Sequence, residues 1–376
     1  MSKFIPVNRP LIHGNEVKII QKCVKEGWIS GEGPYVRKFE NIFAKKLNKK
    51  YSISTSNGTS ALEIALGSLN LKKNSLVMVS NFTIVSCLNA ILRNNLKPVF
   101  VDVNQDDFNI SIDDFEKKIS SKIKAVILPH TYGLCGDIDS IARYQRKYKF
   151  KVIEDCAESL GAKYKNKYVG NFGDLSTFSF YSNKLITCGE GGMILTNNKK
   201  LNEECKRLKN LYFGKKERFK HDKISSNYRL SSIQCAFGIA QLKNFKQNLT
   251  RKVKIGEFYN SKLSKFKFLK LPLLKQKYSK NVFWVYPLII KKINKINKKH
   301  FEKFLMLNGV GTRDLFYPLN MQPFLNKSLS KIKNTNAHFL YKNGLYIPAG
   351  LGNTFKEFRK VVSIIDKYSK IYFQKK

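Results

Sequence analysis

The segment FSFYSNKLITCGEGG, residues 178–192, places a single lysine between an alternating apolar run and a glycine-rich turn. The apolar run is typical of a β-strand, and Gly-Glu-Gly-Gly is typical of a turn. Most lysines of the chain have polar neighbours, whereas Lys184 has Phe180, Leu185 and Ile186 close to it in sequence. We expect its amine to be partly desolvated, which lowers the pKa of a lysine and makes it a usable nucleophile.

Two interpretations of Lys184 follow from these neighbours. A partly desolvated amine is what a Schiff-base lysine needs, and pyridoxal phosphate is the commonest cofactor held in this way. Alternatively, Lys184 is a structural residue at a strand end, with its stem along the core and its ammonium in solvent. The segment alone does not favour either interpretation.

The pattern of strands and helices around this segment predicts the fold class. Seven short apolar runs are predicted strands, at residues 51–56, 75–80, 98–103, 125–130, 151–155, 176–181 and 193–197. Helix-like segments separate the first five runs, at residues 59–69, 84–95, 111–120 and 140–149. Near-continuous apolar strands alternating with helices predict an α/β fold with a mostly parallel sheet covered on both faces.

The rest of the chain is predicted to form a smaller α+β domain. A helical pattern covers residues 228–242, and the basic stretch QNLTRKVK, residues 247–254, is interpreted as a linker. We therefore predict a large domain at residues 1–250, with the N-terminal segment, and a small C-terminal domain at residues 251–376. The small domain has a strand-like run at 283–290 and helix-like segments at 300–309 and 355–368.

Composition narrows the class of protein. The chain has 376 residues, of which 43% are hydrophobic, and it contains no apolar run long enough to span a membrane. Its first residues lack the apolar segment of a secretory signal. The seven cysteines are scattered and never form a CxxC pair, which indicates a reducing cytoplasm with neither a disulfide framework nor a metal site.

The net charge of +42 raises the alternative of a nucleic-acid-binding protein. Only eleven of the 69 basic residues are arginine, the residue favoured for bidentate phosphate recognition, and the lysines are spread along the whole chain. This distribution indicates a compositional bias rather than a focused binding surface. We expect no specific nucleic-acid binding.

Polar residues follow the predicted strands at the edge where ligands collect in α/β folds. Gly58 and Thr59 begin a helix whose free N–H groups would attract a phosphate, although Thr59 or Ser60 could instead be a simple helix cap. Asp155 ends the fifth strand, where a carboxylate needs a partner. The pyridinium nitrogen of pyridoxal phosphate is one such partner, and a helix cap is the alternative.

Four further polar residues are candidates for binding a ligand, and some of them could instead have ordinary structural roles. Glu158 lies one helical turn after Asp155 and is either a ligand or a solvated helix residue, and Ser179 could donate its hydroxyl to a phosphate. Asn227 would normally be a cap or turn residue. Arg229 is a candidate for anchoring a carboxylate or a diphosphate.

The order and spacing of these motifs resemble one family. SNGTSAL (56–62), PHTYG (129–133), EDCAESLGA (154–162), the Lys184 segment and NYRLSSIQCAFGIAQL (227–242) follow the pattern of the DegT/StrS type of nucleotide-sugar aminotransferases. The resemblance runs from GWISGEGPYVRKFE (27–40) to DLFYPLNMQP (314–323). It implies a fold-type I enzyme that depends on pyridoxal phosphate (PLP), and it looks most similar to the branch that forms GDP-perosamine.

The resemblance implies a role for each matching residue. Lys184 would hold the cofactor covalently and later move the proton, Asp155 would pair with the ring nitrogen, and Glu158 would lie near the phenolic oxygen. Phosphate contacts would come from Gly58, Thr59, Ser179 and, from the neighbouring subunit, Asn227. Candidates for binding the substrate are Trp28, Arg229 and Tyr317. The family often has an aromatic residue over the cofactor at the position where this chain has Ile84.

In the implied reaction the amino group of L-glutamate first moves to the cofactor, which becomes pyridoxamine phosphate. The amino group then moves to C4 of a GDP-linked 4-keto-6-deoxy sugar. The product would be used for a surface polysaccharide such as O-antigen. Such enzymes are cytoplasmic homodimers with shared active sites. A dTDP- or UDP-linked sugar, or a 3-keto sugar, remains open. A related sugar dehydratase would need a residue such as His at position 184, so the lysine argues against it.

Overall fold

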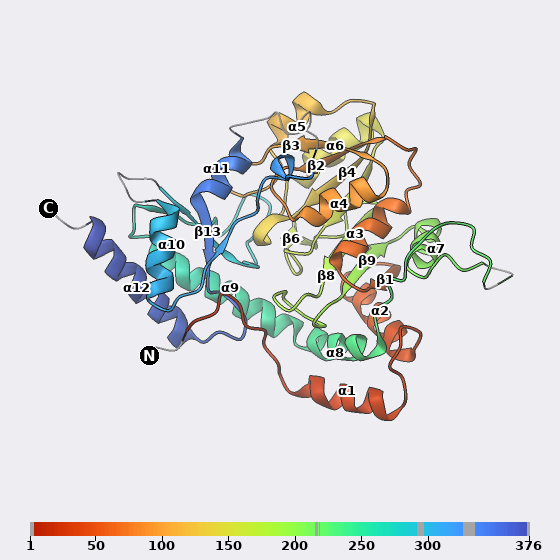
Figure 1. Ribbon diagram of the computed structural model, residues 1–376, viewed down its shortest axis with the longest axis horizontal. Coiled ribbons are helices and arrows are strands. Elements are labelled where there is room, and N and C mark those ends of the chain that lie inside the picture. Colours follow the sequence, from red (N-terminus) through yellow and green to blue (C-terminus); the bar gives the residue numbers. More distant parts are fainter. Residues whose placement is uncertain (1–3, 215–216, 218, 292–296, 326–334, 374–376) are drawn as a thin grey trace.

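The computed structural model describes residues 4–214, 217, 219–291, 297–325 and 335–373, and its larger part is built on a seven-stranded sheet (Figure 1). In chain order the strands are β1 (Tyr51–Thr55), β2 (Leu76–Ser80), β3 (Lys97–Val101), β4 (Ile123–Pro129), β5 (Lys151–Asp155), β8 (Leu175–Ser179) and β9 (Gly192–Thr196). Their spatial order is β1-β9-β8-β5-β4-β2-β3, and only β9 runs antiparallel to its neighbours. The carboxyl ends of β1, β5 and β8 therefore meet at one edge.

Helices cover both faces of this sheet because its strands are apolar on both sides. Alternate strand residues such as Val77 and Met78 belong to two different cores. One core is closed by α3 (Gly58–Gly67), α4 (Val85–Arg93) and α7 (Lys199–Leu208). The other is closed by α2 (Pro34–Lys46), α5 (Ile112–Lys118), α6 (Ile138–Tyr148) and α8 (Ser232–Lys243).

The predicted α/β fold is confirmed, and every predicted strand and helix of the central sheet is present with ends shifted by only a few residues. The helix predicted at residues 228–242 begins four residues late. Ser231 is its N-cap, because the Ser231 side chain accepts a hydrogen bond from the Gln234 N–H and the Gln234 side chain accepts one from the Ser231 N–H. Residues 228–230 therefore precede the helix.

A second, four-stranded antiparallel sheet forms the C-terminal part. Its order is β10-β11-β13-β12, from β10 (Leu269–Lys270), β11 (Tyr286–Ile290), β12 (Arg313–Asp314) and β13 (Gly344–Ile347). The helices here are α9 (Phe245–Leu263), α10 (Lys298–Leu307), α11 (Asn336–Asn343) and α12 (Phe355–Phe373), and β6 (Lys163–Tyr164) and β7 (Lys167–Tyr168) form a separate two-stranded ribbon. None of the described helices is long and apolar enough to cross a membrane.

The linker predicted at residues 247–254 is wrong, because these residues lie inside helix α9. The buried face of the helix repeats at helical spacing but includes two polar residues, Asn248 and Lys252. The Asn248 side chain donates a hydrogen bond to the Leu185 carbonyl (3.3 Å), and Lys252 Nζ donates one to the Ala349 carbonyl. Because two of the buried positions are polar, the sequence shows no clear apolar helical repeat and resembles a charged linker.

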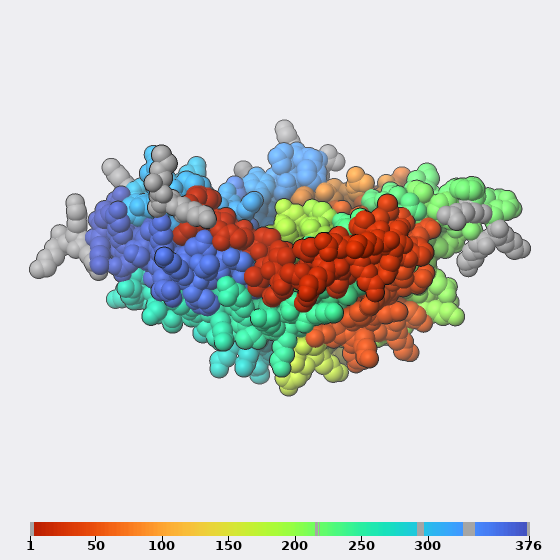
Figure 2. All heavy atoms as spheres, turned by 90° about the horizontal axis from the view of Figure 1, so that it is seen from below, coloured from red at the N-terminus to blue at the C-terminus, as the bar shows by residue number. Residues whose placement is uncertain are grey.

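The N-terminal segment, residues 4–14, joins the two parts of the molecule. It hydrogen-bonds to the C-terminal part, where the Gly311 N–H donates to the Ile5 carbonyl (3.0 Å) and the Ala349 N–H to the Val7 carbonyl (3.0 Å). The segment then leads to α1 (Asn15–Lys25), which packs on α8. Figure 2 shows these N-terminal residues along the outside of one face. The division into two domains near residue 250 remains a prediction.

Candidate active site

A cavity of about 370 Å³ lies where the carboxyl ends of β1, β5 and β8 meet. Six of the predicted site residues line it, namely Gly58, Thr59, Asp155, Glu158, Ser179 and Lys184. They come from the start of α3, the turn after β5, the end of β8 and the turn that follows β8. Segments that are more than 100 residues apart in sequence thus supply one site, as expected for the strand ends of an α/β sheet.

Lys184 projects its amine into this cavity from the turn after β8. Its backbone N–H donates to the Tyr181 carbonyl (2.9 Å), which holds the turn. Desolvation lowers the pKa of Lys184 to about 8, although the nearby carboxyls of Glu158 and Asp155 act in the opposite direction. The amine is therefore much closer to deprotonation at neutral pH than an ordinary lysine amine, as a nucleophile requires.

Asp155 is buried at the end of β5 and lacks a strong cationic partner. Its two carboxylate oxygens accept hydrogen bonds from the Ala157 N–H (3.1 Å) and the Cys87 thiol (3.3 Å). Burial raises the pKa of Asp155 despite these bonds. Among the described residues no basic side chain lies within ion-pair distance, so the carboxylate has room for a cation supplied by a ligand.

Glu158 lies in the turn that follows β5, three residues after Asp155. One carboxyl oxygen accepts a hydrogen bond from the Tyr132 N–H (3.1 Å). Burial raises the pKa of Glu158 to about 8, even though Lys184 favours the ionised form. At neutral pH the carboxyl is mostly protonated, so it can donate a hydrogen bond to an anionic oxygen of a ligand.

The start of helix α3 forms the anion-binding side of the cavity. Its N-cap is Asn57, which forms a capping box with Ser60, so the alternative in which Thr59 or Ser60 is the N-cap does not hold. The N–H groups of Gly58 and Thr59 have no acceptor within the described part of the chain and point out of the first turn. A Cβ atom on Gly58 would come within 2.9 Å of the Ser179 Cβ, so only glycine lets the helix start and the serine come together.

These features fit the cofactor expected from the sequence. PLP has a phosphate, a ring nitrogen that becomes cationic, a phenolic oxygen and a carbonyl carbon that reacts with amines. In the cavity, the helix N–H groups and a hydroxyl match the phosphate, and a buried carboxylate matches the ring nitrogen. A protonated carboxyl matches the phenolic oxygen, and a partly desolvated lysine matches the carbonyl carbon. The donor set of this chain therefore matches PLP.

Four predicted residues do not line the cavity of the single chain, namely Trp28, Asn227, Arg229 and Tyr317. Arg229 forms an ion pair with Glu32 (3.8 Å) and donates a hydrogen bond to Asn210 (2.7 Å), while Asn227 accepts one from the Arg229 N–H (3.3 Å). The Tyr317 ring packs edge-on against Tyr341. Their roles stay predictions.

The sequence interpretation missed the aromatic wall of the cavity. Trp284, Phe316 and Tyr346 line it from the C-terminal part, and the ring centroid of Trp284 lies 3.6 Å from Lys184 Nζ. The run FWVYPLII predicts a strand, and the aromatic pair at its start is the sequence signal that points to the wall. Ile84, where the family often has an aromatic residue, also lines the cavity.

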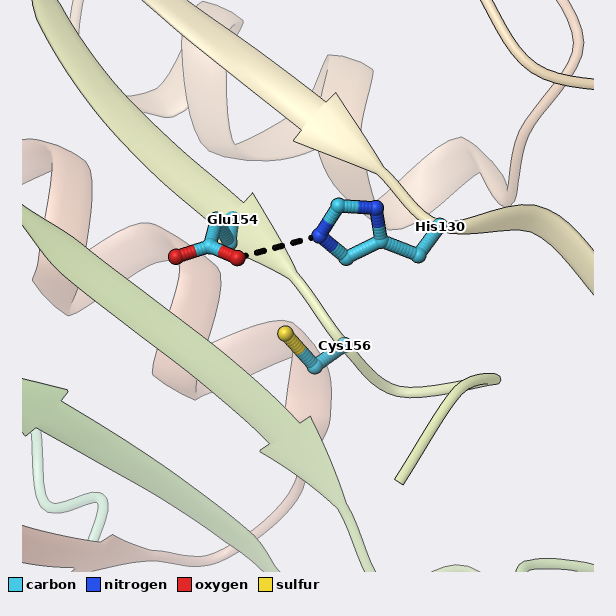
Figure 3. A group of neighbouring side chains, drawn as sticks. All are labelled: His130, Glu154 and Cys156. Carbon is cyan, nitrogen blue, oxygen red and sulfur yellow. Dashed lines mark hydrogen bonds and ion pairs between the residues drawn. The ribbon is translucent and has the colours of Figure 1, made fainter. Parts of the chain in front are cut away.

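A buried cluster of His130, Glu154 and Cys156 lies beside the site (Figure 3) and has side chains of the kinds that bind metals. The His130 Nδ1 accepts a hydrogen bond from the Gly136 N–H, so its Nε2 carries the proton that it donates to Glu154 (3.1 Å). Burial opposes ionisation of Glu154, yet the hydrogen bonds from His130 and from the Gly173 N–H (2.6 Å) lower its pKa.

These hydrogen bonds account for the cluster without a metal. Glu154 also accepts hydrogen bonds from the N–H groups of Gly170 (2.8 Å) and Phe172 (2.7 Å). The carboxylate therefore joins the turn before β8 to the end of β5. The network is a structural support beneath Asp155.

Comparisons with known proteins agree with this geometry. A model of the DegT/DnrJ/EryC1/StrS aminotransferase family matches residues 10–366. The chain is 37% identical to the GDP-perosamine synthase of Escherichia coli O157:H7 over 88% of this chain and 89% of that enzyme. It is 34% identical to the GDP-perosamine synthase of Vibrio cholerae over 97% and 99%.

The chain also shares its fold with proteins of known structure. The aminotransferase PseC of Helicobacter pylori, involved in the biosynthesis of pseudoaminic acid, superposes with a TM-score of 0.92 over 98% of this chain and all of that chain, at 22% identity.

Proposed function

The chain belongs to the DegT/DnrJ/EryC1/StrS aminotransferase family, and we propose that it transfers the amino group of L-glutamate to C4 of a GDP-linked 4-keto-6-deoxy sugar. It is a PLP-dependent sugar aminotransferase. The observation that carries the proposal is the meeting of the Lys184 amine and the Asp155 carboxylate in one cavity at the strand ends. The proposal of a GDP-linked substrate is supported by the names of two relatives, and amination at C4 is what the sequence resemblance implies.

The residues of this chain have separate tasks in the proposed reaction. When bound, PLP supplies a carbonyl that exchanges amines and a protonated ring that withdraws electrons. Asp155 would keep the proton on the ring nitrogen, because a buried carboxylate favours a cation beside it. Glu158 donates its proton in a hydrogen bond to the phenolic oxygen, and the start of α3 with Ser179 holds the phosphate.

Lys184 acts twice in each half of the reaction. Its amine first holds the cofactor and is displaced by the amine of L-glutamate. The freed Nζ would then hold and move the proton that leaves the α-carbon of the amino acid, and it would move a proton in the opposite sense when the keto sugar is bound. A lysine whose pKa is about 8 is suited to both tasks.

Two alternatives are weaker. A sugar dehydratase on the same fold needs a residue at position 184 that cannot hold the cofactor covalently, and lysine does not meet that need. A nucleic-acid-binding protein would explain the charge of +42 but not the cavity.

We further propose a cytoplasmic homodimer with shared active sites. Asn227 and Arg229 lie away from the cavity of their own chain, which is consistent with a position at the cavity of a partner. All seven cysteines are free and buried, as suits a reducing compartment.

One assay tests the substrate. The purified protein with L-glutamate is offered GDP-, dTDP- and UDP-linked 4-keto-6-deoxy sugars and a 3-keto sugar, and products are identified by mass spectrometry and NMR. We expect a 4-amino GDP sugar. Amination of only the dTDP or UDP sugar would overturn the GDP specificity, and no amination of any sugar would overturn the function.

A further inference from the structure

Trp284 lies directly against the reacting amine. The centroid of its ring is 3.6 Å from Lys184 Nζ, well within the distance at which an aromatic face attracts a cation. Trp284 is 9% exposed, and both residues line the same cavity. A desolvated contact of this kind stabilises the ammonium more than a surface contact does.

The indole is held in this position from two sides. Its Nε1–H donates a hydrogen bond to the carbonyl of Asn183 (3.1 Å), the residue before Lys184. Its ring also packs against the ring of Tyr132, whose N–H binds Glu158. The indole and the lysine are thus fixed relative to each other through the backbone of the turn after β8.

The backbone before Trp284 is strained in a way that supports a function for this placement. Phe283 has a φ of 54°, in the left-handed region that a bulky residue rarely adopts. The Phe283 N–H donates to the Asn281 side chain (2.7 Å), which holds this conformation. Gly133 makes room for it, because a Cβ there would lie 2.5 Å from the Phe283 nitrogen. Strain of this kind persists where surrounding structure imposes it, often at a functional site.

The described charged groups around the amine are too far from Nζ to form an ion pair with it. Asp155, at the end of β5, and Glu158, in the turn that follows, face Lys184, and each favours its ammonium form only when ionised. No described carboxylate lies within ion-pair distance of Nζ, and Glu158 is mostly protonated at neutral pH. The aromatic face is therefore the nearest group that favours a positive charge on this nitrogen.

We propose that Trp284 is a positioning residue that holds the free Lys184 ammonium over its indole face during the stages in which the lysine carries a proton. The ring keeps the amine on its side of the cavity instead of letting it turn toward Glu158 and Asp155, which line the same cavity. This inference rests on the proposed function only in that Lys184 is the reacting amine.

The test measures the protonation of Lys184 without turnover. The full-length protein is loaded with pyridoxamine 5′-phosphate, which has no carbonyl and leaves Lys184 free. Acetylation of Lys184 by acetic anhydride is followed by mass spectrometry as a function of pH, and the exposed Lys262 in the same sample is the internal reference. The chain has only two tryptophans, so fluorinated tryptophan in a Trp28→Phe background replaces Trp284 alone.

Fluorination weakens the attraction of the ring for a cation and scarcely changes its shape. We expect the midpoint of Lys184 acetylation to fall stepwise from mono- to di- to trifluorotryptophan, and by about one pH unit in Trp284→Leu. Trp284→Phe, which keeps a ring but loses the Nε1 hydrogen bond, is expected to shift less than Trp284→Leu.

Two outcomes would overturn the inference. One is a midpoint that is the same across the fluorinated series. The other is an equal shift in Trp284→Phe and Trp284→Leu, which would assign the effect to the hydrogen bond with Asn183. A failure of Lys184 to bind PLP covalently would instead contradict the proposed function, and it is read separately from the absorbance of the PLP-loaded protein.

Discussion

Burial in one cavity shifts the pKa values of Lys184 and Asp155 in opposite directions. Desolvation lowers the pKa of the lysine amine. The same desolvation raises the pKa of the aspartate, so that its ionised form needs a cation beside it. Both residues were found from the sequence, because each ends or follows an apolar strand. Trp284 was not, since its position beside Lys184 depends on the packing of the C-terminal part and on the strained Phe283.

Lys184→Ala is expected to remove the visible absorbance of lysine-bound PLP and to lower turnover by at least about 1,000-fold. The side chain makes no hydrogen bond or ion pair within the described residues, so the fold should persist. Absorbance spectra, steady-state rates and thermal unfolding check this, with Lys262→Ala as the control. Wild-type turnover in Lys184→Ala would contradict the proposed function.

Asp155→Asn is expected to bind PLP but to lower turnover by about 100-fold or more, because a neutral amide cannot keep the ring nitrogen protonated. Single-turnover kinetics with L-glutamate should show the loss in the proton-transfer step. Asp114→Asn, which removes a half-exposed ion pair with Lys118, is the matched control. A rate in Asp155→Asn equal to that of the control would count against the role of Asp155.

At the scale of elements, helix α9 shows where a sequence interpretation fails. The strands and helices of the central sheet were predicted because their apolar residues recur at regular spacing. The first turns of α9 bury Asn248 and Lys252 instead, and a buried lysine cannot be distinguished from a solvated one by composition. The partners of these residues, Leu185 and Ala349, lie far away in sequence, so only the tertiary structure reveals the helix.

The burial of Lys252 makes stability depend on pH. Desolvation lowers its pKa to about 7, whereas an unfolded lysine titrates near ~10.4. Between these values the unfolded chain binds the proton and the folded chain does not. The free energy of unfolding therefore gains up to about 1.4 kcal/mol per pH unit from this residue as the pH rises.

Lys252→Met should remove this dependence. Chemical unfolding of Lys252→Met and wild type between about pH 7 and pH 9 should give a difference that moves in favour of wild type as the pH rises. The exposed Lys246→Met on the same helix should follow wild type throughout. A constant difference between Lys252→Met and wild type would show that the amine stays charged in the folded protein.

At the scale of the whole molecule, the cavity of one chain contains the reacting lysine but not Asn227. If two chains share their sites, a mixture of inactive Lys184→Ala and Asn227→Ala proteins, unfolded and refolded together, forms heterodimers with one intact site. We expect activity to return to about a quarter of wild type, because half of the dimers are mixed and each has one of two sites intact. Each variant refolded alone is the control, and no recovery in the mixture would argue against shared sites.

The N-terminal segment has a consequence for how the protein is made. The Asn353 side chain donates a hydrogen bond to the Pro6 carbonyl, which joins residues 347 positions apart. During synthesis residues 5–9 leave the ribosome early, yet some of their partners, such as Ala349 and Asn353, emerge only near the end of translation. Such distant contacts slow folding. The carbonyls of Pro6 and Val7 stay without these partners until almost the whole chain exists, so a premature stop before residue 349 removes the hydrogen bonds from Ala349 and Asn353.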